Sequence, residues 1–337
     1  MASTIIDFKK LLSACVHLSR IAGHTIRETH KEGQLGAHNK KDASDKQDGQ
    51  KMEAADVLTI ADLRAQHVIV SNLRTMFPNI RIVGEEDEGD AKSEASKLGE
   101  TPSISLADVP VLEDLIVPSD LAEALTLKDT CLWIDPLDGT IEFVRGNLHN
   151  VCVLIGIAVR DRPVAGVVLQ PFVVDENPNG CVTYGAAGVG VFGDRVPAQS
   201  DAPNVLTLGA EEKSLKLPRI QKSVEILRST GIAEPVVSQG AGQNLLKVLR
   251  GETSFFIQGP GASRWDSCAN EALLLAVGGK VTNLDGSPYQ YVQDAPNYLN
   301  SEGLIAGRTE DIHSQVLNAV LASTEMEESA EKRAKTS

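Results

Sequence analysis

The sequence predicts an α+β fold, and three stretches of the 337-residue chain carry this prediction. Apolar side chains recur at helical spacing over residues 5–30, so the chain opens with an amphipathic helix. Residues 151–192 contain β-branched apolar runs separated by turn residues, which is typical of antiparallel strands. After about residue 200, short apolar runs alternate with helical patterns. We therefore expect an N-terminal α+β domain over 1–200, a smaller C-terminal α/β domain over 201–324, and a disordered tail over 325–337.

The elements of the N-terminal part follow from apolar periodicity and turn residues. A polar loop at 31–52 separates the first helix from the second, and residues 88–129, with weak periodicity, are interpreted as an insertion. Arg160-Asp161-Arg162-Pro163 joins two apolar runs and indicates a hairpin. The expected helices are 58–73 and 119–126, and the expected strands are 80–83, 131–134, 151–159, 164–169, 182–184 and 189–192.

The C-terminal part is expected to alternate strands with helices. Its last expected helix stops at Gly278-Gly279, a common signal for a helix C-terminus. The tail from Glu325 onward is charged and poor in apolar residues, which is typical of a disordered segment. The expected strands are 224–227, 236–237 and 255–257, and the expected helices lie near 214–222, 242–250 and 267–277.

Composition limits the classes of partner. The formal charge of −14 argues against nucleic acid or an anionic membrane as a main partner, because both attract basic proteins. The five cysteines are scattered, without a Cys-x-x-Cys pair, which favours a reducing compartment, and we expect the cytoplasm. No stretch approaches the roughly 20 apolar residues that a membrane-spanning helix needs. A monomer and a homodimer both remain open.

Two aspartates three residues apart follow a short apolar strand. In Asp135-Pro136-Leu137-Asp138-Gly139-Thr140, both carboxylates and a backbone carbonyl can point into one space. Hard divalent cations prefer such oxygen ligands, and magnesium completes its shell with water and substrate phosphate. An ordinary Pro-x-Asp-Gly turn is the alternative interpretation.

Three further acidic positions have ordinary interpretations when each is taken alone. Glu85, within Gly84-Glu85-Glu86-Asp87 at the end of a strand, could simply belong to an acidic loop. Asp266 follows Trp265 at the start of a helix, where aspartate commonly caps the first-turn amides. Asp56 precedes Asp62, which belongs to the first turn of the second expected helix, and lies on a loop where it could reach a water molecule.

Taken together, these elements form an ordered set of motifs. They run Asp56/Thr59/Asp62, Glu85-Glu86, Asp135-Pro-Leu-Asp138-Gly-Thr140 and Trp265-Asp266-x-x-Ala269 along the chain. This order resembles the lithium-sensitive, magnesium-dependent phosphatase superfamily over about residues 5–320. That superfamily includes inositol monophosphatase, inositol polyphosphate 1-phosphatase and 3'(2'),5'-bisphosphate nucleotidase. The resemblance implies a layered αβαβα sandwich of the sugar-phosphatase type, with the active site between its two parts.

The resemblance also implies a role for each residue of the site. Glu85, Asp135 and the carbonyl of Leu137 would hold one Mg²⁺, and Asp135, Asp138 and Asp266 a second. Glu85 could also help to hold a third, weaker ion, and Li⁺ would inhibit by displacing one Mg²⁺. Thr140 and Asp56 would orient and deprotonate the attacking water. The amides of Gly139 and Thr140 would hold phosphoryl oxygens, and Gly240 and Asn244 would belong to the substrate site.

Several motifs look most like the bisphosphate nucleotidases: Gly139, residues 150–158, Gly240-Ala-Gly242, residues 265–271 and residues 276–280. Two departures remove donor or cationic groups from the substrate pocket of that group. Thr207-Leu-Gly-Ala-Glu-Glu-Lys213 stands where they usually have a Ser/Thr-Arg-Ser-His loop, and Asn244 where they tend to have lysine.

The leading expectation is hydrolysis of a small phosphorylated substrate, adenosine 3',5'-bisphosphate, to AMP and phosphate. An inositol polyphosphate 1-phosphatase acting on inositol 1,4-bisphosphate, or a dual-specificity enzyme, is the alternative. A non-catalytic protein of the same fold that binds a phosphorylated ligand is the alternative from another class.

Overall fold

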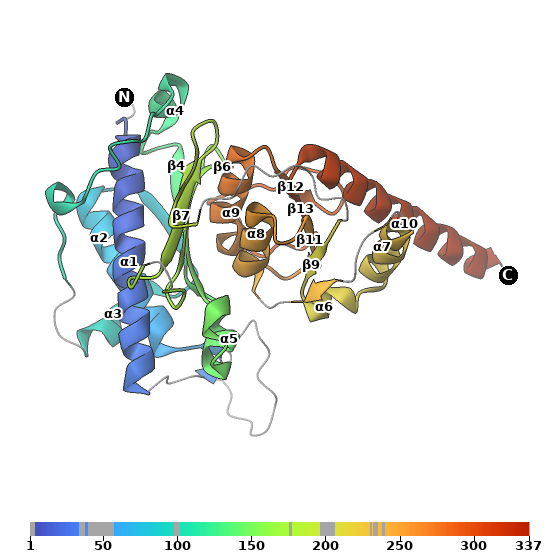
Figure 1. The fold of residues 1–337 in the computed structure, drawn as a ribbon, viewed down its shortest axis with the longest axis horizontal. Helices are drawn as coiled ribbons and strands as arrows, with labels where there is room; N and C mark the ends of the chain where they lie inside the picture. Colours follow the sequence, from blue (N-terminus) through green and yellow to red (C-terminus); the bar gives the residue numbers. More distant parts are fainter. Residues whose placement is uncertain are drawn as a thin grey trace.

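Two long helices cover one face of a six-stranded sheet at the N-terminal side of the molecule (Figure 1). They are α1 (Phe8–Glu32) and α2 (Ile60–Met76). The computed structural model describes residues 4–33, 38–39, 57–97, 102–174, 177–195, 206–229, 231, 235–237 and 240–336. In spatial order the sheet contains β3 (Arg81–Gly84), β4 (Thr130–Asp138), β5 (Cys152–Val159), β6 (Arg162–Gln170), β7 (Cys181–Ala186) and β8 (Gly190–Gly193). All its neighbours pair antiparallel except β3 and β4, which are parallel.

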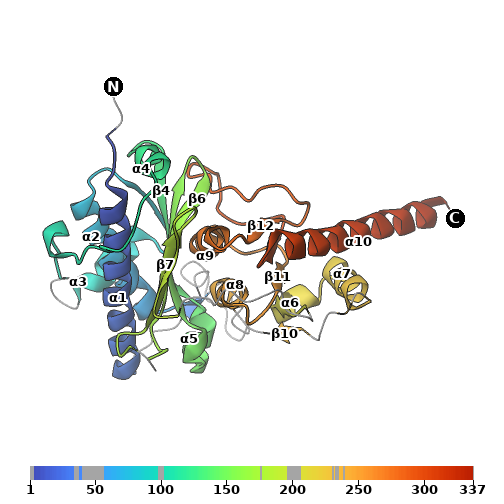
Figure 2. The same ribbon diagram turned by 45° about the horizontal axis from the view of Figure 1, so that its top comes forward.

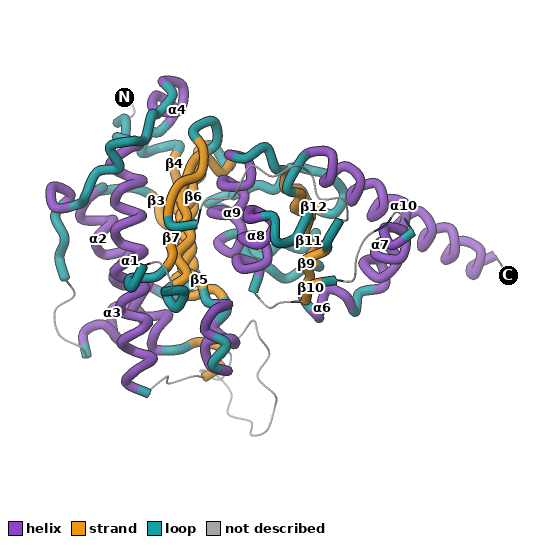
Figure 3. The backbone as a smooth tube through the Cα atoms, viewed as in Figure 1, coloured by secondary structure: helices purple, strands orange, loops and turns teal. Residues whose placement is uncertain are grey.

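A second sheet of five strands lies beyond a middle layer of two helices (Figures 1 and 2). The middle helices are α8 (Ala241–Arg250) and α9 (Trp265–Ala276), and α9 packs on β5 and β6 of the first sheet. The outer helices are α7 (Pro218–Arg228) and α10 (Glu310–Thr336). In spatial order the second sheet contains β10 (Val236–Val237), β9 (Leu208–Ala210), β11 (Phe255–Gln258), β13 (Leu304–Gly307) and β12 (Lys280–Asn283). The expected αβαβα layering is therefore confirmed, and the alternation of layers is plain in Figure 3.

Shorter elements connect these layers. The small sheet of β1 and β2 and the helices α3 to α6 belong to the connections, with two short 3-10 turns at Leu106–Asp108 and Leu148–Asn150. The bounds are β1 (His38–Asn39), β2 (Val57–Leu58), α3 (Glu88–Ser96), α4 (Ser119–Ala124), α5 (Thr140–Arg145) and α6 (Glu212–Leu215). None of the helices in the described ranges is long and apolar enough to cross a bilayer.

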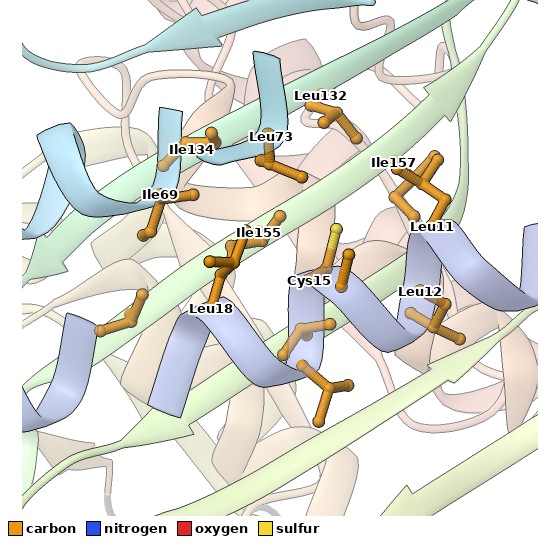
Figure 4. Packing of buried hydrophobic residues seen from close by; sticks show 14 of the residues in the cluster. Leu11, Leu12, Cys15, Leu18, Ile69, Leu73, Leu132, Ile134, Ile155 and Ile157 are labelled. Carbon is orange, nitrogen blue, oxygen red and sulfur yellow. The ribbon is translucent and has the colours of Figure 1, made fainter. Parts of the chain in front are cut away.

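The stripe that predicted α1 is the face that this helix buries. Asp7 begins the helix by accepting a hydrogen bond from the amide of Lys10, at 3.1 Å, and Gly33 ends it in the left-handed conformation. Figure 4 shows side chains of α1 and α2 packed against β4 and β5, and these side chains are almost completely buried. Full burial of one such aliphatic side chain contributes roughly 1.5–3 kcal/mol, so packing holds the helices on the sheet.

The expected hairpin forms between β5 and β6, with a tighter turn than the sequence indicates. Arg160 and Asp161 alone make the turn, and both have positive φ, 50° and 61°. Two consecutive residues in that conformation are characteristic of a type I′ turn, whose twist matches that of the flanking strands. Arg162 and Pro163, expected in the loop, instead belong to β6.

Several segments differ from the sequence-based expectation. Strand β1 lies within the expected loop 31–52, and β9, β12, β13 and the start of α10 were not expected. Residues 224–227, expected as a strand, lie in α7, where Ile220, Val224 and Leu227 are buried at helical spacing. In the 88–129 segment, one helix was expected at 119–126, and α4 lies there. The segment also contains α3, which was not expected. Helix α10 continues to Thr336, across the segment whose composition predicts disorder.

A buried carboxylate on α9 ties this helix to the hairpin. Glu271 accepts hydrogen bonds from Arg162, at 2.9 Å, and from the hydroxyl of Tyr291, at 2.7 Å. Burial raises the pKa of Glu271 from 4.5 to about 7, although the Arg162 guanidinium opposes the shift. The folded state therefore holds a proton that the unfolded chain has already released between these two pH values.

Glu271→Gln should consequently change the pH dependence of stability. Because the folded pKa is raised, the native protein loses stability through this group as pH rises from about 4.5 to about 7. The amide has no proton to lose, so the stability of the variant relative to the native protein should improve by up to about 3 kcal/mol between pH 5 and pH 8. Denaturant unfolding in EDTA at several pH values measures this difference. A difference that does not change with pH would contradict the expectation.

Candidate active site

A β-bulge turns both aspartates of β4 toward the same space. Asp135 pairs with Leu154 and Asp138 with Cys152, so three steps along β4 correspond to two steps along β5. In a regular strand, residues three apart point to opposite faces, and the extra residue of a bulge cancels that alternation. Asp135, Leu137 and Asp138 therefore all line one cavity of about 150 Å³ at the end of the strand.

Parallel pairing of β3 with β4 brings Glu85 to the same cavity. The ladder continues one residue beyond β3, where the amide of Glu85 donates to the carbonyl of Ile134 at 3.0 Å. Gln66 of α2 holds the next residue by hydrogen bonds to both backbone groups of Glu86, of which the one from the Glu86 amide measures 2.9 Å. The loop interpretation of Glu85 is thus replaced by a fixed strand end that lines the cavity.

Asp266 enters the cavity from the first turn of α9. Its carboxylate accepts from the amide of Ser263, at 2.8 Å, which precedes the helix. The side chain therefore orders the incoming loop, and the ordinary interpretation as a cap of first-turn amides does not describe this bond. Asp266 lines the cavity together with Glu85, Asp135 and Asp138.

Three of these carboxyl groups, those of Asp135, Asp138 and Asp266, have raised pKa values. Burial raises the pKa of Asp135 well above its ordinary value, and the charges of Glu85, Asp138 and Asp266 raise it further. Burial and the nearby carboxylates do the same for Asp138, and they raise the pKa of Asp266 to about 7. Gathering acids in a buried space is unfavourable unless cations neutralise them.

Asp138 provides a test of whether a cation fits. One of its oxygens, Oδ2, is buried and has no hydrogen-bond partner, although the amide of Gln243 at the start of α8 donates to this carboxylate. A Cβ atom at Gly242 would lie 2.6 Å from that Oδ2, so glycine there leaves room for the carboxylate. An unpartnered buried carboxylate oxygen is costly, and a bound cation would satisfy it.

In this structure the carboxylates do not surround a single point closely enough to form a complete metal-binding site. Among the residues that the structure describes, no three histidine, cysteine, aspartate or glutamate side chains already stand in metal-holding geometry. Asp135 directs Oδ1 to the amide of Leu137, at 2.9 Å, and Asp266 is similarly engaged by its own loop. The electrostatic coupling and the unpartnered oxygen of Asp138 nevertheless match the donor set that a hard divalent cation requires.

Thr140 hydrogen-bonds to Asp62 at the edge of the cavity. The Thr140 hydroxyl lies 3.0 Å from Oδ1 of Asp62 and 3.1 Å from the carbonyl of Leu137. A hydroxyl has one proton, so these bonds are alternatives, and the charged carboxylate is the stronger acceptor. The other oxygen of Asp62 accepts from the amide of Thr59, at 2.9 Å, and from its hydroxyl, in a capping box that begins α2.

Asp56, the sequence-based partner of Thr140, lies outside the described residues. In the structure, Asp62 accepts a hydrogen bond from the Thr140 hydroxyl. Asp62 lies three residues after Thr59, in the first turn of α2. The sequence places Asp62 in the right motif, but its capping pattern gives no sign that the carboxylate also faces β4.

The remaining expected substrate residues divide into two groups. Gly139 and Thr140, at the start of α5, and Gly240, at the start of α8, line the cavity. Gly139 has φ of 84°, and a Cβ there would lie 3.0 Å from the carbonyl oxygen of Asn150, so a side chain would be strained at this turn. Asn244 does not reach the cavity; it is fully buried and donates to the carbonyl of Gly240 at 2.9 Å.

Three charged residues of the cavity were missed in the sequence: Glu142 on α5, Glu211 and Lys213. Glu211, just before α6, is buried and raises the pKa of both Asp138 and Asp266. Lys213 on α6 lines the same cavity and lies 3.3 Å from Glu211. Glu211 and Lys213 belong to the stretch 207–213, which departs from the nucleotidase motif. That departure was the only feature of the sequence that pointed to these two residues.

Comparisons with known proteins agree with this fold and identify the family. Rat 3'(2'),5'-bisphosphate nucleotidase 1 is 31% identical over 313 residues, which cover 91% of this chain and 93% of the relative. The extragenic suppressor protein SuhB from Bartonella henselae superposes with a TM-score of 0.62 at 20% identity, covering 91% of this chain and 96% of that chain. SaIMPase-II, solved with 2'AMP and with inositol monophosphate, superposes with TM-scores of 0.62 and 0.59 at 17% identity; the matches cover 95% and 93% of this chain and 97% and 96% of those chains. A model of the inositol monophosphatase family matches residues 7–325, and the chain therefore belongs to that family.

Proposed function

We propose that this chain is a magnesium-dependent phosphoric monoester hydrolase of the 3'(2'),5'-bisphosphate nucleotidase kind. The observation that carries the proposal is the convergence of Glu85, Asp135, Asp138 and Asp266 on one buried cavity beside the Thr140–Asp62 pair. The identity to rat bisphosphate nucleotidase, over nearly all of both chains, supports the same activity.

The proposed ligand assignment follows the sequence motifs. Glu85, Asp135 and the carbonyl of Leu137 would hold one Mg²⁺, and Asp135, Asp138 and Asp266 a second, with Glu85 as a contact for a weaker third. The chemistry that magnesium supplies in such a site is neutralisation of phosphoryl oxygens and activation of a water nucleophile. Li⁺ inhibition by displacement of one Mg²⁺ belongs to this proposal.

The protein's own groups would position the reaction. Asp62 would take the Thr140 proton at Oδ1 as the Thr140 oxygen takes a proton from the attacking water, so this relay leaves one proton on the Asp62 carboxylate. The amides of Gly139 and Thr140 would donate to phosphoryl oxygens, and their position at the start of α5 on the cavity lining supports this role. Phosphoryl transfer depends mainly on positioning and charge neutralisation, which this arrangement would provide.

The proposed substrate is adenosine 3',5'-bisphosphate, cleaved at the 3'-phosphate to give AMP. The nucleotide and the inositol phosphate bound in SaIMPase-II support a small phosphorylated substrate, and inositol 1,4-bisphosphate is the second candidate. A cytoplasmic location is proposed from the five cysteines, all of which are free and buried.

Phosphate release tests this function directly. We expect the purified protein to release phosphate from adenosine 3',5'-bisphosphate with Mg²⁺ and to lose the activity in EDTA. Turnover of inositol 1,4-bisphosphate alone would reject the nucleotidase assignment and retain the phosphatase. No release from either substrate would favour a non-catalytic protein that binds a phosphorylated ligand.

A further inference from the structure

The cavity has an unequal distribution of charge. Among the described residues that line it, Lys213 alone carries a positive side chain, against six acids: Glu85, Asp135, Asp138, Glu142, Glu211 and Asp266. Bound cations would offset the four acids of the proposed metal site, and Glu142 is engaged by Arg145, Asn147 and Asn150. Glu211 and Lys213 are therefore the charged lining residues left outside the proposed metal site and the hydrogen bonds of Glu142.

Lys213 lines the cavity beside a buried carboxylate, and its own side chain is half-exposed. Glu211 is buried, with 5% of its side chain exposed, whereas the side chain of Lys213 is 52% exposed. The ammonium lies 3.3 Å from the Glu211 carboxylate, so a buried anion anchors a cation that remains open to solvent. In Figures 1 and 2, α6, which contains Lys213, and α5, which begins at Thr140, both lie on the lower side of the molecule.

Lys216, the residue that follows α6, lacks these features. Lys216 pairs with Glu212 at 2.7 Å, both side chains are mostly exposed, and neither residue lines the cavity. The two lysines thus differ in position relative to the cavity, but each is a half-exposed or exposed cation that pairs with a neighbouring glutamate. Lys216 is a matched control.

We propose that Lys213 is a specificity-determining residue that binds the second, non-scissile phosphate of a bisphosphate substrate. Glu211 holds its ammonium in place when the site is empty and releases it to the incoming phosphate. This proposal rests on the proposed phosphatase function. It adds that the site selects small molecules with two phosphate groups. Lys213 would supply a cationic contact in a pocket where the nucleotidase-type donor loop is replaced by residues 207–213.

The consequence is a selective effect on bisphosphates. A phosphate bound by an ammonium gains a charge-assisted hydrogen bond, and loss of that bond weakens binding by roughly tenfold. Lys213→Met should therefore raise KM for adenosine 3',5'-bisphosphate about tenfold, with kcat little changed. KM for adenosine 3'-monophosphate, which lacks the second phosphate, should stay within about twofold, because Lys213 has nothing to contact there. Lys216→Met should change neither.

Two further measurements separate recognition from a structural effect. Calorimetric titration of AMP, which retains the non-scissile phosphate, should show weaker binding to Lys213→Met in the presence of Mg²⁺, while Lys213→Arg should bind like the native protein. Glu211→Gln should increase the preference for the bisphosphate over the monophosphate, because it removes the competing partner, and it should do so only while Lys213 is present.

The outcomes distinguish this inference from the proposed function. Absence of phosphate release from every substrate in the native protein would overturn both. If the native protein is active and Lys213→Met changes KM equally for both adenosine nucleotides, or for neither, the assignment of Lys213 is wrong and the phosphatase function stands. If the native protein prefers inositol phosphates, inositol 1,4-bisphosphate and inositol 1-phosphate form the corresponding pair, with the same criterion.

Discussion

Asp135→Asn should reduce kcat by about a thousandfold or more while leaving the fold intact. Asp135 is the carboxylate assigned to both proposed magnesium ions, and an amide supplies neither the charge nor the second ligating oxygen. The amide oxygen can still accept the hydrogen bond from Leu137, which measures 2.9 Å in the native protein, so the bulge of β4 keeps its local support.

The stability of this variant gives an independent result. In the native protein without metal, burial and three neighbouring carboxylates oppose the charge of Asp135 and raise its pKa. Asparagine removes that repulsion, so in EDTA at pH 7 the Tm of the variant should equal or exceed the native value. Mg²⁺ should raise the native Tm, because it binds the folded state, and should raise the variant's Tm much less.

Asp120→Asn on α4 is the matched control, because this exposed residue lies away from the cavity. It should keep both the activity and the Mg²⁺-dependent rise in Tm. A large fall in the Tm of Asp135→Asn in EDTA would indicate that the side chain mainly supports the fold. Unchanged activity would remove the basis for the metal site.

The order of the site's motifs could be predicted from the sequence alone, whereas their arrangement in space is seen only in the structure. Glu85 and Asp135 could be paired only through the family resemblance, because parallel pairing of β3 with β4 crosses more than 40 residues that separate them in the chain. The bulge that aligns Asp135 with Asp138 depends on the register against β5, which no local pattern encodes.

The incorrect strand at 224–227 illustrates a limit of short apolar runs. Val224, Ile226 and Leu227 form a run that fits a strand or a buried helix equally well. Pro218 at the first position of α7 and Ile220 four residues before Val224 were the signals for a helix, and packing against α10 favours that choice. Similarly, charge composition predicted a disordered tail, although the same residues have high helix propensity and continue α10.

The side-chain contacts between distant parts of the chain were the hardest feature to predict from the sequence. Asp62 satisfies a capping pattern at the start of α2, which accounts for its presence without any further role. Only the approach of α2 to the end of β4 places its second oxygen 3.0 Å from Thr140. Glu211 and Lys213 were hidden for the same reason, since α6 meets the cavity through the tertiary arrangement.

Thr140→Val should lower kcat by about 10²–10³-fold with little change in KM. Valine keeps the shape of threonine, so the start of α5 should persist, but it removes the hydroxyl that lies between Asp62 and the proposed water. Thr140→Ser restores the hydroxyl and should recover most of the activity. Steady-state kinetics, with Mg²⁺ affinity measured separately, checks that the metal site is unaffected.

Asp62→Asn should cause a comparable loss of kcat and, in addition, a loss of about 1 kcal/mol in stability, because the same carboxylate caps α2. If Asp62 acts through the Thr140 hydroxyl, the double variant should lose little more activity than either single variant, since both remove one proton path. Asp56→Asn, the change suggested by sequence alone, should then be much milder. Multiplicative losses in the double variant, or a severe effect of Asp56→Asn with a mild effect of Asp62→Asn, would show that Thr140 and Asp62 do not act as one unit.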